Sequence, residues 1–131
     1  MFKTVLFPID RSPDSQEAAE TVASLAKFCQ SRLIILSVEE VPDENAAPID
    51  PAAIDQLLAQ AQTGFTNLGI ETETIHRQGK PAFTICDVAD ELEVDLIVMG
   101  CRGIGLTQEG ANESVSNRVI NLAPCPVLIV P

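Results

Sequence analysis

The 131-residue sequence contains no tryptophan and no tyrosine, and aromatic residues make up only 4% of it. Positive charge is also scarce: 8 lysines and arginines stand against 19 aspartates and glutamates, a formal net charge of −11 at pH 7. Nonspecific nucleic-acid binding requires basic side chains that neutralise phosphates, and an anionic membrane surface makes the same demand. We therefore expect neither nucleic acid nor a membrane among the partners of this chain.

Long apolar runs are absent as well. No stretch approaches the roughly 18 residues of a membrane span, and the first apolar run ends at Asp10 and Arg11, too early for a signal peptide. We expect a cytoplasmic protein. Its cysteines, at 29, 86, 101 and 125, form no CxxC pair, so in a reducing compartment we expect free thiols that serve mostly as small core residues.

What the sequence does contain is apolar periodicity, in a chain that is 46% hydrophobic. Short β-branched runs predict strands at 3–9, 32–38, 70–76, 95–99 and 126–130. Helical spacing predicts four helices between them, and the second has the clearest stripe, made of Ile54, Leu57, Leu58, Ala61, Phe65 and Leu68. The alternation predicts one α/β domain over residues 1–131, with a five-stranded parallel sheet doubly wound by helices on both faces.

Open parallel sheets usually bind ligands beyond the carboxyl ends of their strands. Four of the eight basic residues follow such predicted ends: Arg11, Arg77, Lys80 and Arg102. This clustering favours an anionic ligand at that edge, although charged residues also belong in ordinary loops.

A glycine-rich segment follows the fourth predicted strand. Residues 100–110 hold four of the seven glycines, and Ser114, Val115 and Ser116 then open a helix. A helix N-terminus with free N–H groups and hydroxyls beside such a segment has the parts of a phosphate cradle. The P-loop string and the dinucleotide GxGxxG are absent, and a flexible surface loop explains the glycines equally well.

Four strings along the chain resemble those of the universal stress protein family. They are Asp10-Arg11-Ser12, Gly79-x-Pro81, DLIVMG at 95–100 and APCPV at 123–127. The resemblance covers essentially the whole chain. It implies a Rossmann-like fold of the adenine nucleotide alpha-hydrolase type, with strand order 3-2-1-4-5.

The ATP-binding branch of that family carries the signature G-x2-G-x9-G-[ST]. Gly100, Gly103 and Ser114 match it, and Glu113 replaces the third glycine. The resemblance implies an adenine nucleotide, with or without Mg2+, laid between the first and fourth strands. Asp10 would meet the adenosine and Val38 would flank the adenine through its backbone. The ribose and phosphates would be held by Gly100, Arg102, Gly103, Ser114, Val115 and Ser116. The nucleotide-binding residues implied are Pro8, Asp10, Val38, Gly100, Arg102, Gly103, Ser114, Val115 and Ser116, with no catalytic residue and no metal ligand among them.

Glu113 is the departure that bears most on the ligand. At about 4 Å from a phosphate charge, its carboxylate would cost roughly 4 kcal/mol at an effective dielectric near 20, or up to about a thousandfold in affinity. Three outcomes are open: repulsion of phosphate, a Mg2+ bridge, or a side chain that points to solvent at the helix start. AMP or ADP is more compatible with Glu113 than metal-free ATP.

The leading interpretation is a stress-response protein that binds an adenine nucleotide as a sensor or binding module and is not an enzyme. The alternative is a family member that binds no nucleotide and acts through protein–protein contacts, for which Glu113 argues. Slow ATP hydrolysis ranks last, because no evident general base is placed at an attacking water. His76, the only histidine, is interpreted as an edge-strand or surface residue. The resemblance also implies a homodimer through the last strand, Pro126 to Val130.

Overall fold

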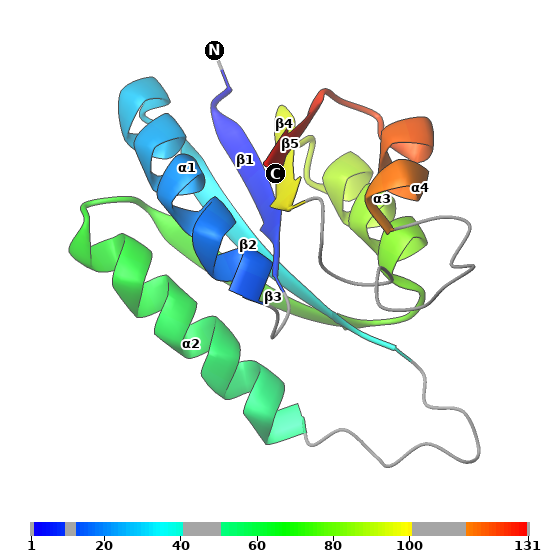
Figure 1. Ribbon diagram of the computed structural model, residues 1–131, viewed down its shortest axis with the longest axis horizontal. Coiled ribbons are helices and arrows are strands. Elements are labelled where there is room, and N and C mark those ends of the chain that lie inside the picture. Colours follow the sequence, from blue (N-terminus) through cyan, green and yellow to red (C-terminus); the bar gives the residue numbers. More distant parts are fainter. Residues whose placement is uncertain (1, 10–12, 41–50, 101–114, 131) are drawn as a thin grey trace.

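The computed structural model describes residues 2–9, 13–40, 51–100 and 115–130, and these form an α/β fold around one parallel sheet (Figure 1). Its strands and helices alternate along the chain. They are β1 (Thr4–Pro8), α1 (Pro13–Cys29), β2 (Arg32–Glu39), α2 (Pro51–Asn67), β3 (Thr72–Gln78), α3 (Pro81–Glu91), β4 (Leu96–Gly100), α4 (Val115–Leu122) and β5 (Val127–Val130).

The sheet has the order β3-β2-β1-β4-β5, and every neighbouring pair of strands is parallel. The fold class and strand order expected from the sequence are therefore confirmed. The winding direction reverses at β1, because β2 and β3 lie on one side of it and β4 and β5 on the other. This reversal makes the carboxyl edge around β1 the position where an open sheet of this kind binds ligands.

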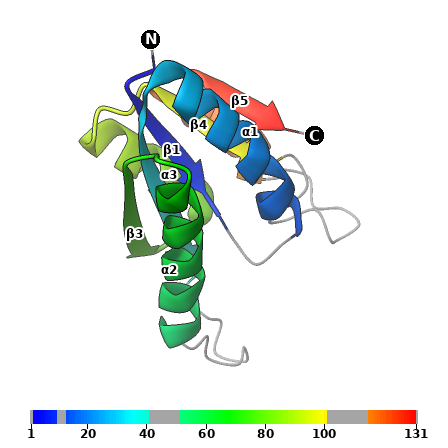
Figure 2. The same ribbon diagram turned by 90° about the vertical axis from the view of Figure 1, so that its left-hand side faces the viewer.

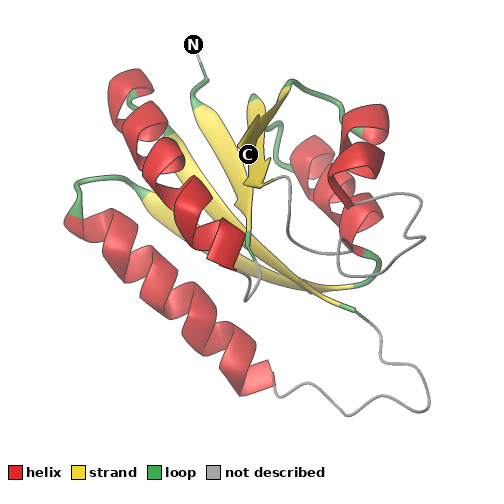
Figure 3. Cartoon of the chain, viewed as in Figure 1, coloured by secondary structure: helices red, strands yellow, loops and turns green. Residues whose placement is uncertain are grey.

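Helices cover both faces of the sheet (Figures 2 and 3). Residues of α1 and α2, such as Val22, Leu58 and Phe65, share one buried cluster with one face of the sheet. Residues of α3 and α4, such as Ile85 and Val119, share a second cluster with the opposite face. Two cores thus hold the sheet from either side.

The strand sequences follow from this double covering. Successive side chains of a strand point to opposite faces, so Leu33 and Ile35 of β2 join the first cluster while Ile34 and Leu36 join the second. All four have no exposed surface. A strand with apolar neighbours on both faces reads as a continuous apolar run rather than as an alternation.

The third strand begins and ends two residues later than expected. Ile70 was expected to start it, but the N–H of Ile70 donates to the Phe65 carbonyl at 3.1 Å and so completes the end of α2. Gly69, with φ of 84°, turns the chain at that point. Leu68 was expected on the buried stripe of the second helix; it lies beyond the end of α2 and is exposed.

Among the helices that the structure describes, none combines the length and the apolar character needed to cross a bilayer.

Candidate functional site

The carboxyl ends of β1, β2 and β4 meet at one edge of the sheet, where the topology reverses (Figure 1). Residues just inside that edge, such as Phe7, Leu36 and Val98, are buried. The last residues of the strands, Pro8 and Gly100, are only half-buried. At this edge the buried core ends and partly exposed residues begin.

Pro8 leaves a hydrogen-bonding gap between β1 and β4. The N–H of Ile9 donates to the Leu36 carbonyl of β2 at 2.8 Å, so the backbone of residue 8 faces β4, because successive residues of a strand address opposite neighbours. Proline has no N–H to donate. The ladder between these two described strands pairs Val5 with Leu96 and Leu6 with Ile97, well short of the carboxyl ends.

Two apolar side chains expected in the site lie on one side of the sheet. Val38, near the end of β2, and Val115, the first residue of α4, are half-buried and pack against the cluster that α3 and α4 share with the sheet. Ser116 follows in the first turn of α4. The other expected nucleotide-binding residues, Asp10, Arg102, Gly103 and Ser114, lie outside the described residues, as does Glu113.

The basic residues expected to draw an anionic ligand behave differently from one another. Nη2 of Arg77 lies 3.0 Å from Oε2 of Glu91 on α3, so the charge of Arg77 is directed to that helix. Lys80 is exposed at the start of α3, which carries no side-chain cap there. Arg11 and Arg102 lie outside the described residues. Of the two that are described, only Lys80 is left for a ligand at the edge.

Three described cysteines, Cys29, Cys86 and Cys125, are free thiols, as the sequence suggested. Burial raises the pKa of the Cys86 thiol, and the nearby charges of Asp87 and Cys125 raise it further. Burial also raises the pKa of Cys125, Asp95 adds to this effect, and a hydrogen bond with the backbone of Ile97 opposes it. Both groups are held as neutral thiols, which are poor nucleophiles. Cys101 lies outside the described residues.

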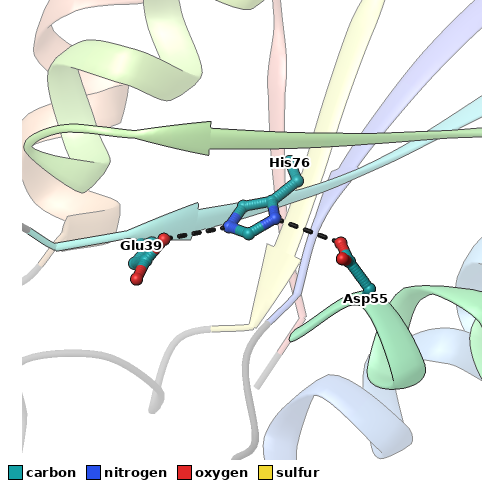
Figure 4. A network of polar contacts seen from close by, with 3 residues as sticks. All are labelled: Glu39, Asp55 and His76. Carbon is teal, nitrogen blue, oxygen red and sulfur yellow. Dashed lines mark hydrogen bonds and ion pairs between the residues drawn. The ribbon is translucent and has the colours of Figure 1, made fainter. Parts of the chain in front are cut away.

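His76 on β3 forms a polar cluster with Glu39 and Asp55, which the sequence did not predict (Figure 4). Nε2 of His76 lies 3.2 Å from Oε2 of Glu39, the last residue of β2, and Nδ1 lies 3.2 Å from Oδ1 of Asp55 on α2. The imidazole is thus an edge-strand residue, as expected, but only 23% of its side chain is exposed. No group of three or more His, Cys, Asp or Glu side chains within the described part of the chain is arranged to hold a metal ion.

Comparison with known proteins decides the family. Residues 1–131 match the sequence profile of the universal stress protein family. The chain is also 58% identical to universal stress protein Sll1654 of Synechocystis sp., over 100% of this chain and 87% of that protein.

The chain belongs to the universal stress protein family. Solved universal stress proteins share its architecture. UspA from Lactobacillus plantarum superimposes with a TM-score of 0.84 at 26% identity, over 99% of this chain and 98% of that one. A universal stress protein crystallised in complex with cAMP superimposes with a TM-score of 0.81 at 25% identity, over 99% of this chain and 97% of that one.

Proposed function

We propose that this universal stress protein binds an adenine nucleotide at the carboxyl edge of its sheet, between β1 and β4, as a binding module rather than an enzyme. The observation that carries the proposal is the interrupted ladder at Pro8, at the topological reversal. A gap in a parallel sheet at this position favours ligand binding there. The match of Gly100, Gly103 and Ser114 to the nucleotide signature supports the same edge.

The described residues fit such a ligand. Val38 and Val115 offer half-buried apolar surface at the edge, which suits the flat face of a purine. The first turn of α4 begins at Val115, and N–H groups at a helix N-terminus favour negative charge. We assign Asp10 to the adenosine and Arg102, Gly103, Ser114 and Ser116 to the ribose and phosphates, following the family signature.

We further propose that the ligand carries few phosphates. The relative solved with cAMP holds a nucleotide with a single phosphate. Glu113 supplies a negative charge where the ATP-binding signature has a glycine, and each additional phosphate charge beside it raises the Coulombic cost. AMP or a similar mononucleotide is therefore favoured over ATP without metal.

The test begins with protein purified without added ligand. Acid extraction and chromatography are expected to release an adenine nucleotide, and AMP is expected to raise the melting temperature more than ATP without Mg2+. A ligand at 100 times its Kd stabilises the folded state by about 2.7 kcal/mol. The proposal is wrong if no nucleotide is extracted and if AMP, cAMP, ADP and ATP, with and without Mg2+, leave the melting temperature unchanged.

The Glu113→Gly variant separates this proposal from its alternative. It is expected to strengthen ATP binding by up to about a thousandfold and to change AMP binding less. Glu93→Gly is the matched control, because Glu93 follows α3 at the opposite edge and has φ of 52°, which glycine adopts freely. If binding appears only in Glu113→Gly, the natural protein acts through protein–protein contacts instead.

We also propose that two copies pair through β5. This strand is one edge of the sheet, and its four residues Val127–Val130 carry no charge. Leu128 is 37% exposed. An uncharged apolar edge with free backbone groups favours pairing with another strand.

A further inference from the structure

His76 lies between the carboxylates of two other elements of the fold (Figure 4). Glu39 ends β2 and Asp55 belongs to α2, and each approaches a different ring nitrogen at 3.2 Å. Asp55 and Glu39 precede His76 by 21 and 37 positions in the sequence. The imidazole therefore bridges the two elements that flank the β2–α2 connection.

Proton counting sets the charge of this bridge. A neutral imidazole carries one N–H and one lone pair, whereas an ionised carboxylate only accepts hydrogen bonds. With a neutral ring, one of the two contacts would place a nitrogen lone pair against a carboxylate oxygen. Only the imidazolium donates to Glu39 and Asp55 at the same time.

Within the part of the chain that the structure describes, the charged groups in contact with the ring are two carboxylates. Glu39 comes from β2, where the buried Ser37 lies directly opposite His76 in the ladder. Asp55 comes from α2. On β3 itself, Arg77 is the adjacent charge, and its guanidinium is paired with Glu91 of α3. Both carboxylates can accept a hydrogen bond from the ring.

The contacts of His76 with Glu39 and with Asp55 differ in their exposure to solvent. This difference decides which contact breaks when the imidazolium loses a proton. The Glu39 side chain is 14% exposed and that of Asp55 is 68% exposed. A carboxylate left without its partner costs more when it is shielded from water. The neutral ring is therefore expected to keep its N–H on Glu39 and to release Asp55 to solvent.

We propose that His76 is a pH-sensitive clasp that, while it is an imidazolium, ties α2 to the end of β2 through Asp55 and Glu39. Imidazoles change charge between pH 5 and 8, so the clasp is closed on the acidic side of this range and opens as the pH rises. This inference does not depend on nucleotide binding.

Double-mutant cycles test the proposal. The coupling between His76 and Asp55 is measured from urea unfolding of the parent, His76→Gln, Asp55→Asn and the double variant, at pH 6 and pH 9. At pH 6 we expect a coupling of about two- to fivefold in the unfolding equilibrium constant, the range of partly exposed ion pairs. At pH 9 we expect the coupling to disappear, while a parallel cycle retains coupling between His76 and Glu39.

The matched control is the Arg32–Glu73 pair, which also joins β2 to β3, at 3.4 Å. Arginine and glutamate side chains ordinarily keep their charge over this range, so the coupling of this pair should be equal at pH 6 and pH 9. Because His76 is the only histidine, 15N NMR of its ring is unambiguous and should show both nitrogens protonated at pH 6. A His76–Asp55 coupling that is the same at pH 9, or a singly protonated ring at pH 6, overturns the clasp. If His76→Gln does not fold, Asp55→Asn must remove part of the stability change between pH 6 and pH 9, and an unaltered change counts against the proposal.

Discussion

Gly79 joins β3 to α3 with φ of 154°, a backbone conformation that side-chain-bearing residues rarely adopt. Its N–H donates to the Glu39 carbonyl at 2.9 Å, and a Cβ at this position would lie 2.6 Å from Oγ1 of Thr84. We expect Gly79→Ala to lower the free energy of unfolding by about 1–3 kcal/mol. Urea denaturation measures the change.

Gly64 is the matched control, because it lies inside α2 and an added Cβ would meet no atom within 4 Å. Alanine has a higher helix propensity than glycine, so Gly64→Ala is expected to stabilise the protein by about 0.5–1 kcal/mol. Equal effects at the two positions would show that backbone strain at Gly79 is unimportant.

The thiols of Cys86, which is buried, and of Cys125, which is half-buried, are expected to make the stability of the protein depend on alkaline pH. The pKa values of Cys86 and Cys125 are raised in the folded state, chiefly by burial. Their contribution to stability is therefore fully present below the pKa of an unfolded thiol, 9.0, and is lost as the pH rises from there through the folded values. The free energy of unfolding should fall as the pH rises above about 9, without interference from tyrosine, which the chain lacks.

The variant with both Cys86→Ala and Cys125→Ala should show a smaller fall over the same pH range. The control is Val88→Ala, which truncates a fully buried side chain in α3, the helix that contains Cys86. It should lower the free energy of unfolding at every pH and leave the decrease at alkaline pH unchanged. A double variant with an unchanged slope would contradict the role assigned to burial of the thiols.

At the scale of elements, α2 is held to the sheet by an aromatic contact. The rings of Phe65 on α2 and Phe7 on β1 meet edge to face, with centroids 6.2 Å apart, and both residues are buried. Phe65→Ala should cost about 3–5 kcal/mol in the free energy of unfolding. Phe28 on α1 is 89% exposed, so Phe28→Ala should change stability by no more than about 0.5 kcal/mol; comparable losses would contradict the packing described here.

The sequence predicted the type and order of the nine elements that the structure describes, because the inner strands are apolar runs and each helix has an apolar stripe. The edge strand β3 is polar and charged, and its β-branched residues alternate with glutamate. The ends of helices and strands were less predictable where the type of a residue suits the next element but its backbone hydrogen bond belongs to the previous one. Ile70 is apolar and β-branched like a strand residue, yet its N–H completes α2. Sequence periodicity records that Ile70 is buried, but not which carbonyl its N–H reaches.

The sequence predicted the position of the candidate site, because the strand order brings the carboxyl ends of the strands together at one edge. The carboxyl edge follows from the parallel order, and Val38 and Val115 lie there. The clasp around His76 was not predictable, because it depends on the register that sets His76 opposite Ser37 and on the position of α2. A histidine in an edge strand gives no sign of partners 21 and 37 residues away.

For the whole molecule, the two edges of the sheet decide how copies can meet. Leu128→Lys places a charge on the exposed edge strand β5, and charges at strand edges oppose pairing. We expect sedimentation velocity to show a dimer for the parent chain and a monomer for this variant. Phe28→Lys, a change on the exposed part of α1, should leave the dimer intact, and a dimeric Leu128→Lys would point to another interface.

The opposite edge of the sheet has a different character. β3 carries Glu73, His76 and Arg77, and the first and last of these are paired with Arg32 and Glu91. The β5 edge is uncharged and the β3 edge is charged, so only the β5 edge favours pairing with a strand of another chain. If two copies join at β5, as proposed, only the charged β3 edges face outward. Charges at strand edges oppose further pairing, so we expect growth to stop at two chains rather than continue into an open-ended filament.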